Sequence, residues 1–219
     1  MNSSLLSLLV LAGIAIFLIL RLRSVLGTRE GFEKPVARPD TLRSGPRQQF
    51  EVIEGGPDED IIDHVEDGSD SAKALAAMKL AEPGFRVSEF LQGARQAYEM
   101  ILMSFERGDV DGLRPFLADD VMETFEAVIN QRNEQGLSIE AEFVGVRETV
   151  LQVATFDRDT NTAEITVRFV AELTSVVRNS DGEIIEGDTS EIKRQRDVWT
   201  FARSMGSDDP NWALVATDG

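Results

Sequence analysis

The sequence predicts an α+β domain in the C-terminal part of the chain, and two observations carry the prediction. Up to Gly136, apolar residues recur every three or four positions, which is the repeat of helices with one buried face. After Gly136 they recur every second position, as in half-buried strands. Helices followed by strands are typical of an α+β fold with an antiparallel sheet. About 135 residues suffice for one such core.

The composition restricts the possible functions. The chain has 219 residues, a formal net charge of −17, one histidine and no cysteine. A nucleic-acid partner is disfavoured because it would require a basic surface. Thiolate sites and multi-histidine metal sites are excluded, and little room is left for a Ser-His-Asp arrangement. The lone His64 lies in an acidic run, where we expect it to be solvent-exposed. We therefore expect no cofactor, no metal and no enzymatic activity.

The charge changes sign along the chain. Residues 1–50 carry seven Lys and Arg against three acids, whereas residues 51–70 carry nine acids and no Lys or Arg. Residues 84–219 carry 13 basic against 26 acidic residues. The change near residue 50 indicates separate segments rather than a uniformly acidic protein.

Residues 3–22 are almost entirely apolar, and as a helix they would be about 30 Å long, which matches the hydrocarbon thickness of a bilayer. A cleaved signal peptide is the alternative, but it needs basic residues before the apolar run. Here Arg21, Arg23 and Arg29 follow the run instead. The pattern predicts a retained transmembrane anchor with its N-terminus outside and the rest of the chain in the cytoplasm.

Residues 23–70 are rich in proline, glycine and charge, and few are aromatic. Such a segment cannot bury enough apolar surface to offset its ordering entropy, so it predicts a flexible linker. Its acidic run at 51–70 is interpreted as a solvated spacer, with the recruitment of a basic partner as the alternative.

Three helices are expected next, with a short helical segment containing Leu113, Phe116 and Leu117 between the second and the third. Residues 71–82 hold strong helix formers and stop at Pro83-Gly84, predicting a short helix that lies on the domain or docks on a membrane or partner. Ser88 is expected to cap a second helix running to about Arg107. Asp120 with Glu123 resembles a capping box that opens a third.

Five strands are expected after Gly136. Two are placed at 143–156 and 164–173, followed by a third after the turn signal Ser180-Asp181-Gly182. A fourth is placed at 197–203 and a fifth at 212–217.

Both tryptophans fall in the last two strands. Period two places Trp199 and Phe201 on one face, with Arg203 at the end of that face and Trp212 on the neighbouring strand. One interpretation is a hairpin that closes the core, with Arg203 satisfying a carboxylate. The other is an aromatic groove with Arg203 at its mouth, suited to an acyl chain or an apolar peptide. Tyr98 is a further candidate for such a pocket.

A family resemblance is carried by DVWTFAR at 197–203 and DPNWALVAT at 209–217, and is supported by RLRSVLGTR at 21–29, by Gly108 to Leu113 and by the hairpin ending at Glu186-Gly187. They resemble the bacterial TimA family, membrane proteins related to the tether of the mitochondrial protein-import motor. The resemblance covers the anchor, the linker and a domain at 83–219. It implies a cone similar to nuclear transport factor 2, with helices packed on a curved antiparallel sheet around an apolar pocket. In the mitochondrial relatives this domain binds inner-membrane lipid, contacts the translocation channel and brings a heat-shock chaperone to it.

The expected function is a membrane-anchored adaptor at the cytoplasmic face of the bacterial inner membrane. It would present a protein-binding domain to a translocon, a chaperone or an assembly factor. The alternatives are a pocket protein that binds a lipid or small molecule, and a pocket enzyme on the same cone.

Overall fold

The computed structural model describes residues 58–218. The predicted anchor at 3–22 and most of the predicted linker lie outside the described residues. Within residues 58–218, no helix is long and apolar enough to cross a membrane. The described elements are α2 (Glu59–Ile62), α3 (Asp70–Ala81), α4 (Val87–Arg107), α5 (Val110–Leu113), α6 (Asp119–Glu134), β1 (Ser138–Asp157), β2 (Thr162–Arg178), β3 (Ile184–Ser204) and β4 (Ala213–Asp218).

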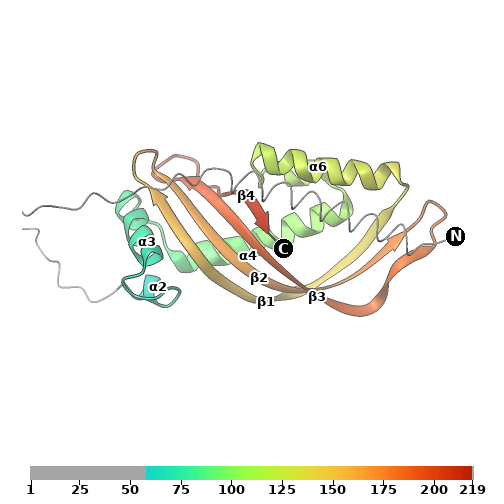
Figure 1. The fold of residues 1–219 in the computed structure, drawn as a ribbon, viewed down its shortest axis with the longest axis horizontal. Coiled ribbons are helices and arrows are strands. Elements are labelled where there is room, and N and C mark those ends of the chain that lie inside the picture. The colour runs from blue at the N-terminus through green and yellow to red at the C-terminus, as the bar shows by residue number, and fades with distance from the viewer. Residues whose placement is uncertain (1–57, 219) are drawn as a thin grey trace, which may run out of the picture. The chain divides into compact units, whose positions relative to one another are not determined.

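The strands form one antiparallel sheet in the order β1-β2-β3-β4, so the predicted α+β fold is confirmed. The sheet is curved, and α4 lies across its concave side (Figure 1). Alternate residues of β2 face α4 and are buried from Ala163 to Leu173. The core is therefore the space between the concave side and the helices.

The prediction of five strands was wrong, because the expected third and fourth strands are one strand, β3. Its pairing with β2 jumps from Ser175–Asp188 to Leu173–Lys193, which leaves four residues of β3 unpaired as a bulge. The bulge interrupts the alternating pattern, but the strand then resumes pairing with the same neighbour. The predicted turn at 180–182 is confirmed, with Gly182 at φ 81°.

The starts of two helices differ from prediction. Ser88 does not cap α4, which begins at Val87 and has no cap from its own preceding side chain. Asp60 instead accepts hydrogen bonds from the backbone N–H groups of Val87 (2.8 Å) and Ser88 (3.0 Å). The expected capping box of α6 is also absent, since its N-cap is Ala118. The Ala118 N–H donates to the Leu214 carbonyl of β4, which fixes where α6 begins.

Helix α3 lies on the sheet edge next to β1, as one of the two interpretations expected. Leu75 and Met78 are fully buried, and the Ser71 hydroxyl accepts a hydrogen bond from the Ala154 N–H of β1 at 3.1 Å. The helix thus covers part of the free edge of β1.

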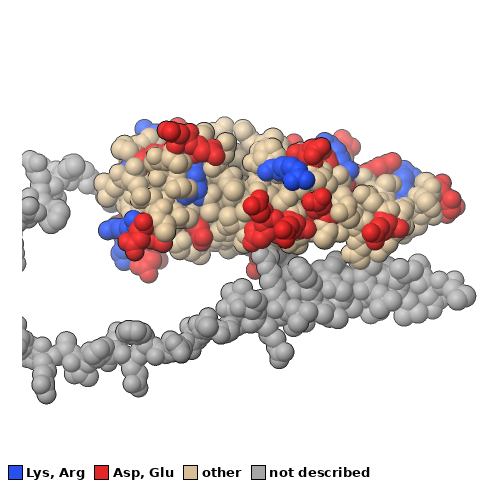
Figure 2. Space-filling view, turned by 90° about the horizontal axis from the view of Figure 1, so that it is seen from above, with Lys and Arg blue, Asp and Glu red and all other residues tan. Residues whose placement is uncertain are grey.

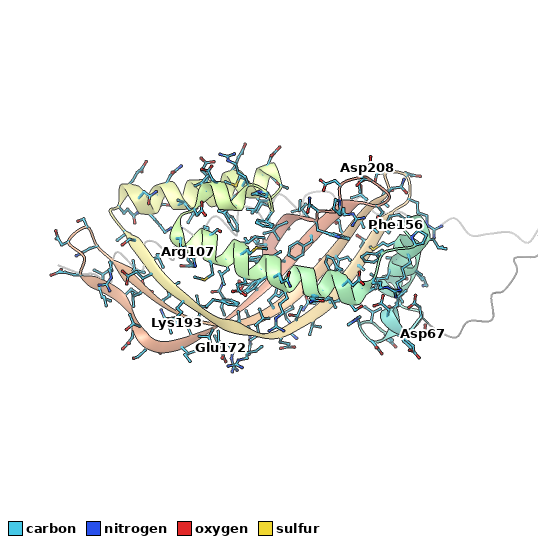
Figure 3. All side chains as sticks on the ribbon, turned by 180° about the vertical axis from the view of Figure 1, so that it is seen from behind. Asp67, Arg107, Phe156, Glu172, Lys193 and Asp208 are labelled. Atoms are coloured by element: carbon cyan, nitrogen blue, oxygen red, sulfur yellow. The ribbon has the colours of Figure 1, made fainter. Side chains whose placement is uncertain are left out.

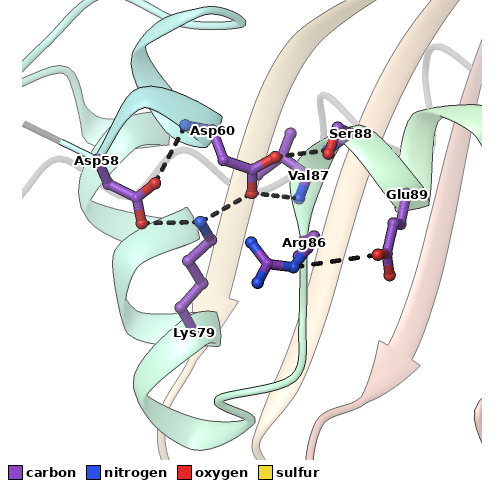
Figure 4. A network of polar contacts seen from close by, with 7 residues as sticks. All are labelled: Asp58, Asp60, Lys79, Arg86, Val87, Ser88 and Glu89. Carbon is purple, nitrogen blue, oxygen red and sulfur yellow. Dashed lines mark hydrogen bonds and ion pairs between the residues drawn. The ribbon is translucent and has the colours of Figure 1, made fainter.

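The last part of the predicted linker is folded rather than flexible. Residues 58–70 include α2, whose Ile61 is buried in the core, and His64 is half-buried instead of exposed. The Nζ atom of Lys79 on α3 lies 2.7 Å from a carboxylate oxygen of both Asp58 and Asp60 (Figure 4). Asp58 and Asp60 thus bind the Lys79 ammonium group, and Asp60 also binds the N-terminus of α4. The composition of the acidic run alone does not indicate these contacts.

Candidate functional site

The concave side of the sheet carries an aromatic cluster, defined here as Phe85, Phe90, Tyr98, Phe169, Trp199, Phe201 and Trp212. Tyr98 of α4 stacks on Phe169 of β2, with ring centroids 4.5 Å apart, and contacts Trp199 at 4.6 Å. Phe90 contacts Trp212 at 4.7 Å. These separations are typical of favourable aromatic pairs, so the cluster joins α4 to β2, β3 and the segment before β4.

The cluster contains one buried hydroxyl, which has a charged partner. The Tyr98 hydroxyl donates to an Asp197 carboxylate oxygen at 2.5 Å, and the Gln195 amide donates to the other oxygen at 3.2 Å. Burial, and then the neighbouring Asp197 carboxylate, raise the pKa of Tyr98 well above its usual range. Tyr98 is therefore a neutral hydrogen-bond donor and a poor candidate for a general base.

Arg203 at the other end of the same strand face forms a second polar anchor. Its guanidinium binds Glu82, directly after α3, and donates to the Pro210 carbonyl at 3.2 Å. It also lies over the ring of Trp212 at 5.7 Å. The Arg203 hydrogen bond, and then one from the Gly206 N–H, hold the pKa of Glu82 below its usual range. The ion pair between Arg203 and Glu82 thus connects β3 to the end of α3. The Arg203 side chain is only 9% exposed.

Four of the five residues predicted for the site, Tyr98, Trp199, Phe201 and Trp212, belong to the aromatic cluster, and the fifth, Arg203, lies against its Trp212 ring. Trp199 and Phe201 share a face as predicted, and both are buried. Their rings contact other rings of the cluster, while Trp212 is half-buried. This arrangement matches the interpretation of a hairpin that closes the core, with Arg203 satisfying a carboxylate.

A separate shallow depression of about 460 Å³ lies at the turn between β1 and β2. It is open to solvent and is lined by Thr155, Phe156, Asp157, Thr160, Thr162 and Glu164. None of the residues predicted for the site lines it. Across residues 58–218, no group of three or more potential metal-ligating side chains is close enough to hold an ion.

Glu106 is a second titratable group on the inner side of the domain. Burial raises its pKa, and the opposing charges of Arg132 and Lys193 counteract part of that effect. Arg132 of α6 also donates to the Phe105 carbonyl at 2.5 Å. The hydrogen bond from Arg132 therefore joins α6 to the end of α4.

The convex side of the sheet carries a feature that the sequence reasoning missed. Strands β1, β2 and β3 each contribute arginines to it, and Glu172 in their midst is labelled on this side in Figure 3. We call it the arginine face and define it as Arg147, Arg168, Arg194 and Arg196. Residues 193–196, Lys-Arg-Gln-Arg, were a local signal for it in an otherwise acidic domain.

Two carboxylates hold part of the arginine face in place. Glu172 pairs with Arg147 at 2.6 Å and with Arg194 at 3.1 Å, and Glu148 pairs with Arg168 at 2.5 Å. Hydrogen bonds from Arg147 and Arg194 lower the pKa of Glu172. By contrast, acidic side chains run along the whole face seen in Figure 2, with basic ones scattered between them.

Comparison with known proteins identifies the family. The sequence profile of the Tim44-like domain matches residues 71–219. The chain belongs to the Tim44-like family. The aromatic cluster and the arginine face therefore both belong to a Tim44-like domain, and the matched range includes all of α3 except Asp70.

Two curated relatives of this Tim44-like chain are mitochondrial. It is 23% identical over 159 residues to the human mitochondrial import inner membrane translocase subunit TIM44, covering 71% of this chain and 35% of the relative. It is 22% identical over 152 residues to TIM44-1 of Arabidopsis thaliana, covering 67% and 32%. The chain thus spans about a third of the length of these relatives.

Among solved structures, the intermembrane space region of chloroplast protein ARC6 is similar with a TM-score of 0.41 and 10% identity. The match covers 58% of this chain and 94% of that one.

Proposed function

We propose that this Tim44-like protein is a membrane-anchored adaptor that presents its α+β domain to protein partners at the cytoplasmic face of the bacterial inner membrane. The observation that carries the proposal is the family match over 71–219, together with relatives named as inner-membrane translocase subunits. A translocon, a chaperone or an assembly factor for membrane proteins would be the partner.

The geometry of the domain favours a binding role over catalysis. The aromatic side chains that could have lined a catalytic or acyl-chain pocket contact one another, and Tyr98 and Arg203 are engaged by Asp197 and Glu82. A rigid core of this kind supports an outer surface on which a partner can dock. The curvature of the sheet around α4 supports a cone of the nuclear transport factor 2 type.

The sequence supplies the anchoring part of the proposal. The apolar residues 3–22 would span the bilayer once, and the arginines that follow favour an outside N-terminus. Residues 21–29, which follow the apolar run, add to the resemblance of the C-terminal segments to the bacterial TimA family. Residues 23–57 would then join the anchor to the domain. The protein would thus hold a partner close to the membrane without a lipid-binding surface on its acidic domain.

Crosslinking in cells tests the proposal directly. A photo-crosslinking amino acid would be placed at exposed positions of the domain, and the same chain without that amino acid would be the matched control. A strain whose chain lacks residues 84–219 would be compared for envelope defects. We expect a discrete set of membrane-associated translocation or assembly proteins that depends on the domain. Failure to capture any such protein, with no envelope defect in the deletion strain, would contradict the adaptor role.

Topology is tested separately with reporter fusions at the C-terminus. A reporter that is active only in the cytoplasm should be active, and one that is active only in the periplasm should be silent. Activity of the periplasmic reporter would overturn the proposed orientation.

A further inference from the structure

We propose that the arginine face on the convex side of the sheet docks an extended acidic segment of a partner protein. This deepens the proposed function, on which it rests, because it names the surface and the chemistry through which the adaptor would hold its partner. The inference follows from the placement of four guanidinium groups, their remaining hydrogen-bond donors and the charge around them.

Sheet register brings the arginines together from three strands. Arg194 of β3 lies opposite Glu172 of β2, and two residues along, Arg196 lies opposite Val170. Arg168 follows on the same face of β2. Arg147 is the extra residue of a β1 bulge, since its neighbours Val146 and Glu148 pair with consecutive residues of β2. The bulge explains how Arg147 can reach Glu172 beside Glu148.

Glu172 orients the guanidinium groups of Arg147 and Arg194 but leaves most of their N–H donors unoccupied. Its side chain is 12% exposed, whereas those of Arg147 and Arg194 are 61% and 62% exposed. A guanidinium has five N–H donors, and the contacts to Glu172 occupy few of them. The remaining donors are held in place before a ligand arrives, which lowers the entropic cost of binding one.

Arg196 adds a cation with no such partner. Within residues 58–218, no carboxylate oxygen lies within 4 Å of its charged atoms, and its side chain is exposed. The four arginines are balanced by Glu148 and Glu172, so the face holds an excess of two positive charges. This excess lies in a region, residues 84–219, where acids outnumber basic residues 26 to 13.

The acidic surroundings favour a narrow ligand. A planar anionic membrane would approach the surrounding acids to within the screening distance of about 8–10 Å, and repulsion would offset the arginine contacts. A single peptide segment contacts the arginine face and little else. Charge complementarity then selects a segment that is itself acidic.

The spacing of the arginines favours an extended segment. Arg194 and Arg196 alternate on β3, which separates their Cα atoms by about 6.6 Å. Carboxylates at alternate positions of an extended peptide have the same spacing. Val198, which is half-buried, lies beside the arginines on this face and offers the peptide a small apolar contact.

The test measures binding of a fluorescein-labelled peptide of twelve alternating Glu and Ser residues to the full-length chain in an uncharged detergent. A peptide with Gln in place of Glu is the control probe. The test variant is R194Q/R196Q, and the matched control is R114Q/R158Q, which removes the same charge from exposed sites outside the arginine face.

We expect the Glu peptide to bind in low salt and to be released in about 0.5 M salt. R194Q/R196Q should weaken binding by at least about fivefold, while R114Q/R158Q should retain it. The Gln peptide should not bind.

Any one of the following results would overturn the inference: no binding of the Glu peptide, an equal loss in both variants, or a preference for phosphatidylglycerol vesicles that depends on Arg194 and Arg196. Salt-sensitive self-association of the chain that R194Q/R196Q abolishes would also overturn it, because the occupant would then be a second copy. Failure of this test leaves the crosslinking result intact, so the two proposals fail separately.

Discussion

The two sides of the sheet use charge in opposite ways. On the concave side, Asp197 and Arg203 are each engaged by a partner from the helical layer, Tyr98 and Glu82. On the convex side, Arg194 and Arg196 keep donors free towards solvent. Asp197 and Arg203, like Arg194 and Arg196, lie on strand β3. Burial therefore decides which charges stabilise the fold and which are available to a partner.

This difference predicts which substitutions unfold the domain and which leave it intact. A side chain in contact with α4 stabilises the fold through packing, and its loss creates a cavity. An exposed side chain on the convex side is solvated in the native state and in the unfolded chain alike, so its loss changes little.

The largest effect is expected for Phe169→Ala. Phe169 is fully buried and contacts Tyr98, Trp199 and Phe201, so truncation leaves a cavity in the centre of the aromatic cluster. We expect a loss of about 3–5 kcal/mol in the free energy of unfolding, measured by chemical denaturation. The convex-side control Val153→Ala, at a position 48% exposed, should change it by less than about 0.5 kcal/mol. Equal effects would contradict the assignment of the two sides.

A smaller loss, about 2–3 kcal/mol, is expected for Glu82→Gln because it leaves the Arg203 guanidinium without its charged partner. Since the pKa of Glu82 is lowered on folding, its contribution is present above its ordinary pKa of 4.5 and is lost as pH falls below it. Unfolding measured from pH 7 to pH 3 should therefore show a smaller acid-induced loss for the variant than for the wild type. Superimposable pH profiles would show that the anchor contributes nothing.

Tyr98→Phe should cost about 1–2 kcal/mol, since it removes the hydroxyl that donates to Asp197 but keeps the ring that stacks on Phe169. The folded state raises the pKa of Tyr98, so the wild type should lose stability as pH rises above about 10, where the unfolded tyrosine ionises. Phenylalanine cannot ionise, and the variant should lack this alkaline loss. Denaturation at pH 8 and pH 10.5 distinguishes the two.

Asp60→Asn should cost about 1 kcal/mol by weakening the cap of α4 and the contact with Lys79. Partial burial alone would raise the pKa of Asp60, but hydrogen bonds from Lys79, Ser88 and Val87 hold it well below its usual range. Its contribution is therefore present above about pH 4 and is lost as pH falls further. The control Asp70→Asn alters an exposed pair, Asp70 with Lys73, and should have a smaller effect on unfolding at pH 7.

The sequence predicts those parts of the fold that depend on neighbouring residues. The stripe of α4 and the alternation of β2 are local patterns, and both elements lie where the patterns indicate. Three of the site residues, Trp199, Phe201 and Arg203, could also be predicted from the sequence, because they alternate along one strand.

The missed features depend on contacts between distant segments. Asp60 caps a helix that begins 27 residues later, and nothing in the acidic run distinguishes it from the other acids. The bulge of β3 is visible only once the register with β2 is known. Predicting the arginine face would require the register of three strands and the position of a bulge in β1. The basic run at 193–196 indicates only part of it.

The smallest change in stability is expected for Arg194→Gln, which removes one guanidinium group from the arginine face. Arg194 is exposed and Arg147 still pairs with Glu172 in the variant, so the loss of stability at pH 7 should be small. The pKa of Glu172 should nevertheless rise towards its ordinary value, because one of the two guanidinium groups that lower it is gone. Carboxyl chemical shifts of Glu172 followed by NMR through an acid titration measure this directly, with Arg158→Gln as the control. A raised pKa accompanied by only the small loss of stability at pH 7 that linkage requires would show that the arginines on this side interact with carboxylates and contribute little to the fold, as a docking surface requires. A large loss of stability would instead place Arg194 among the charges that hold the sheet together.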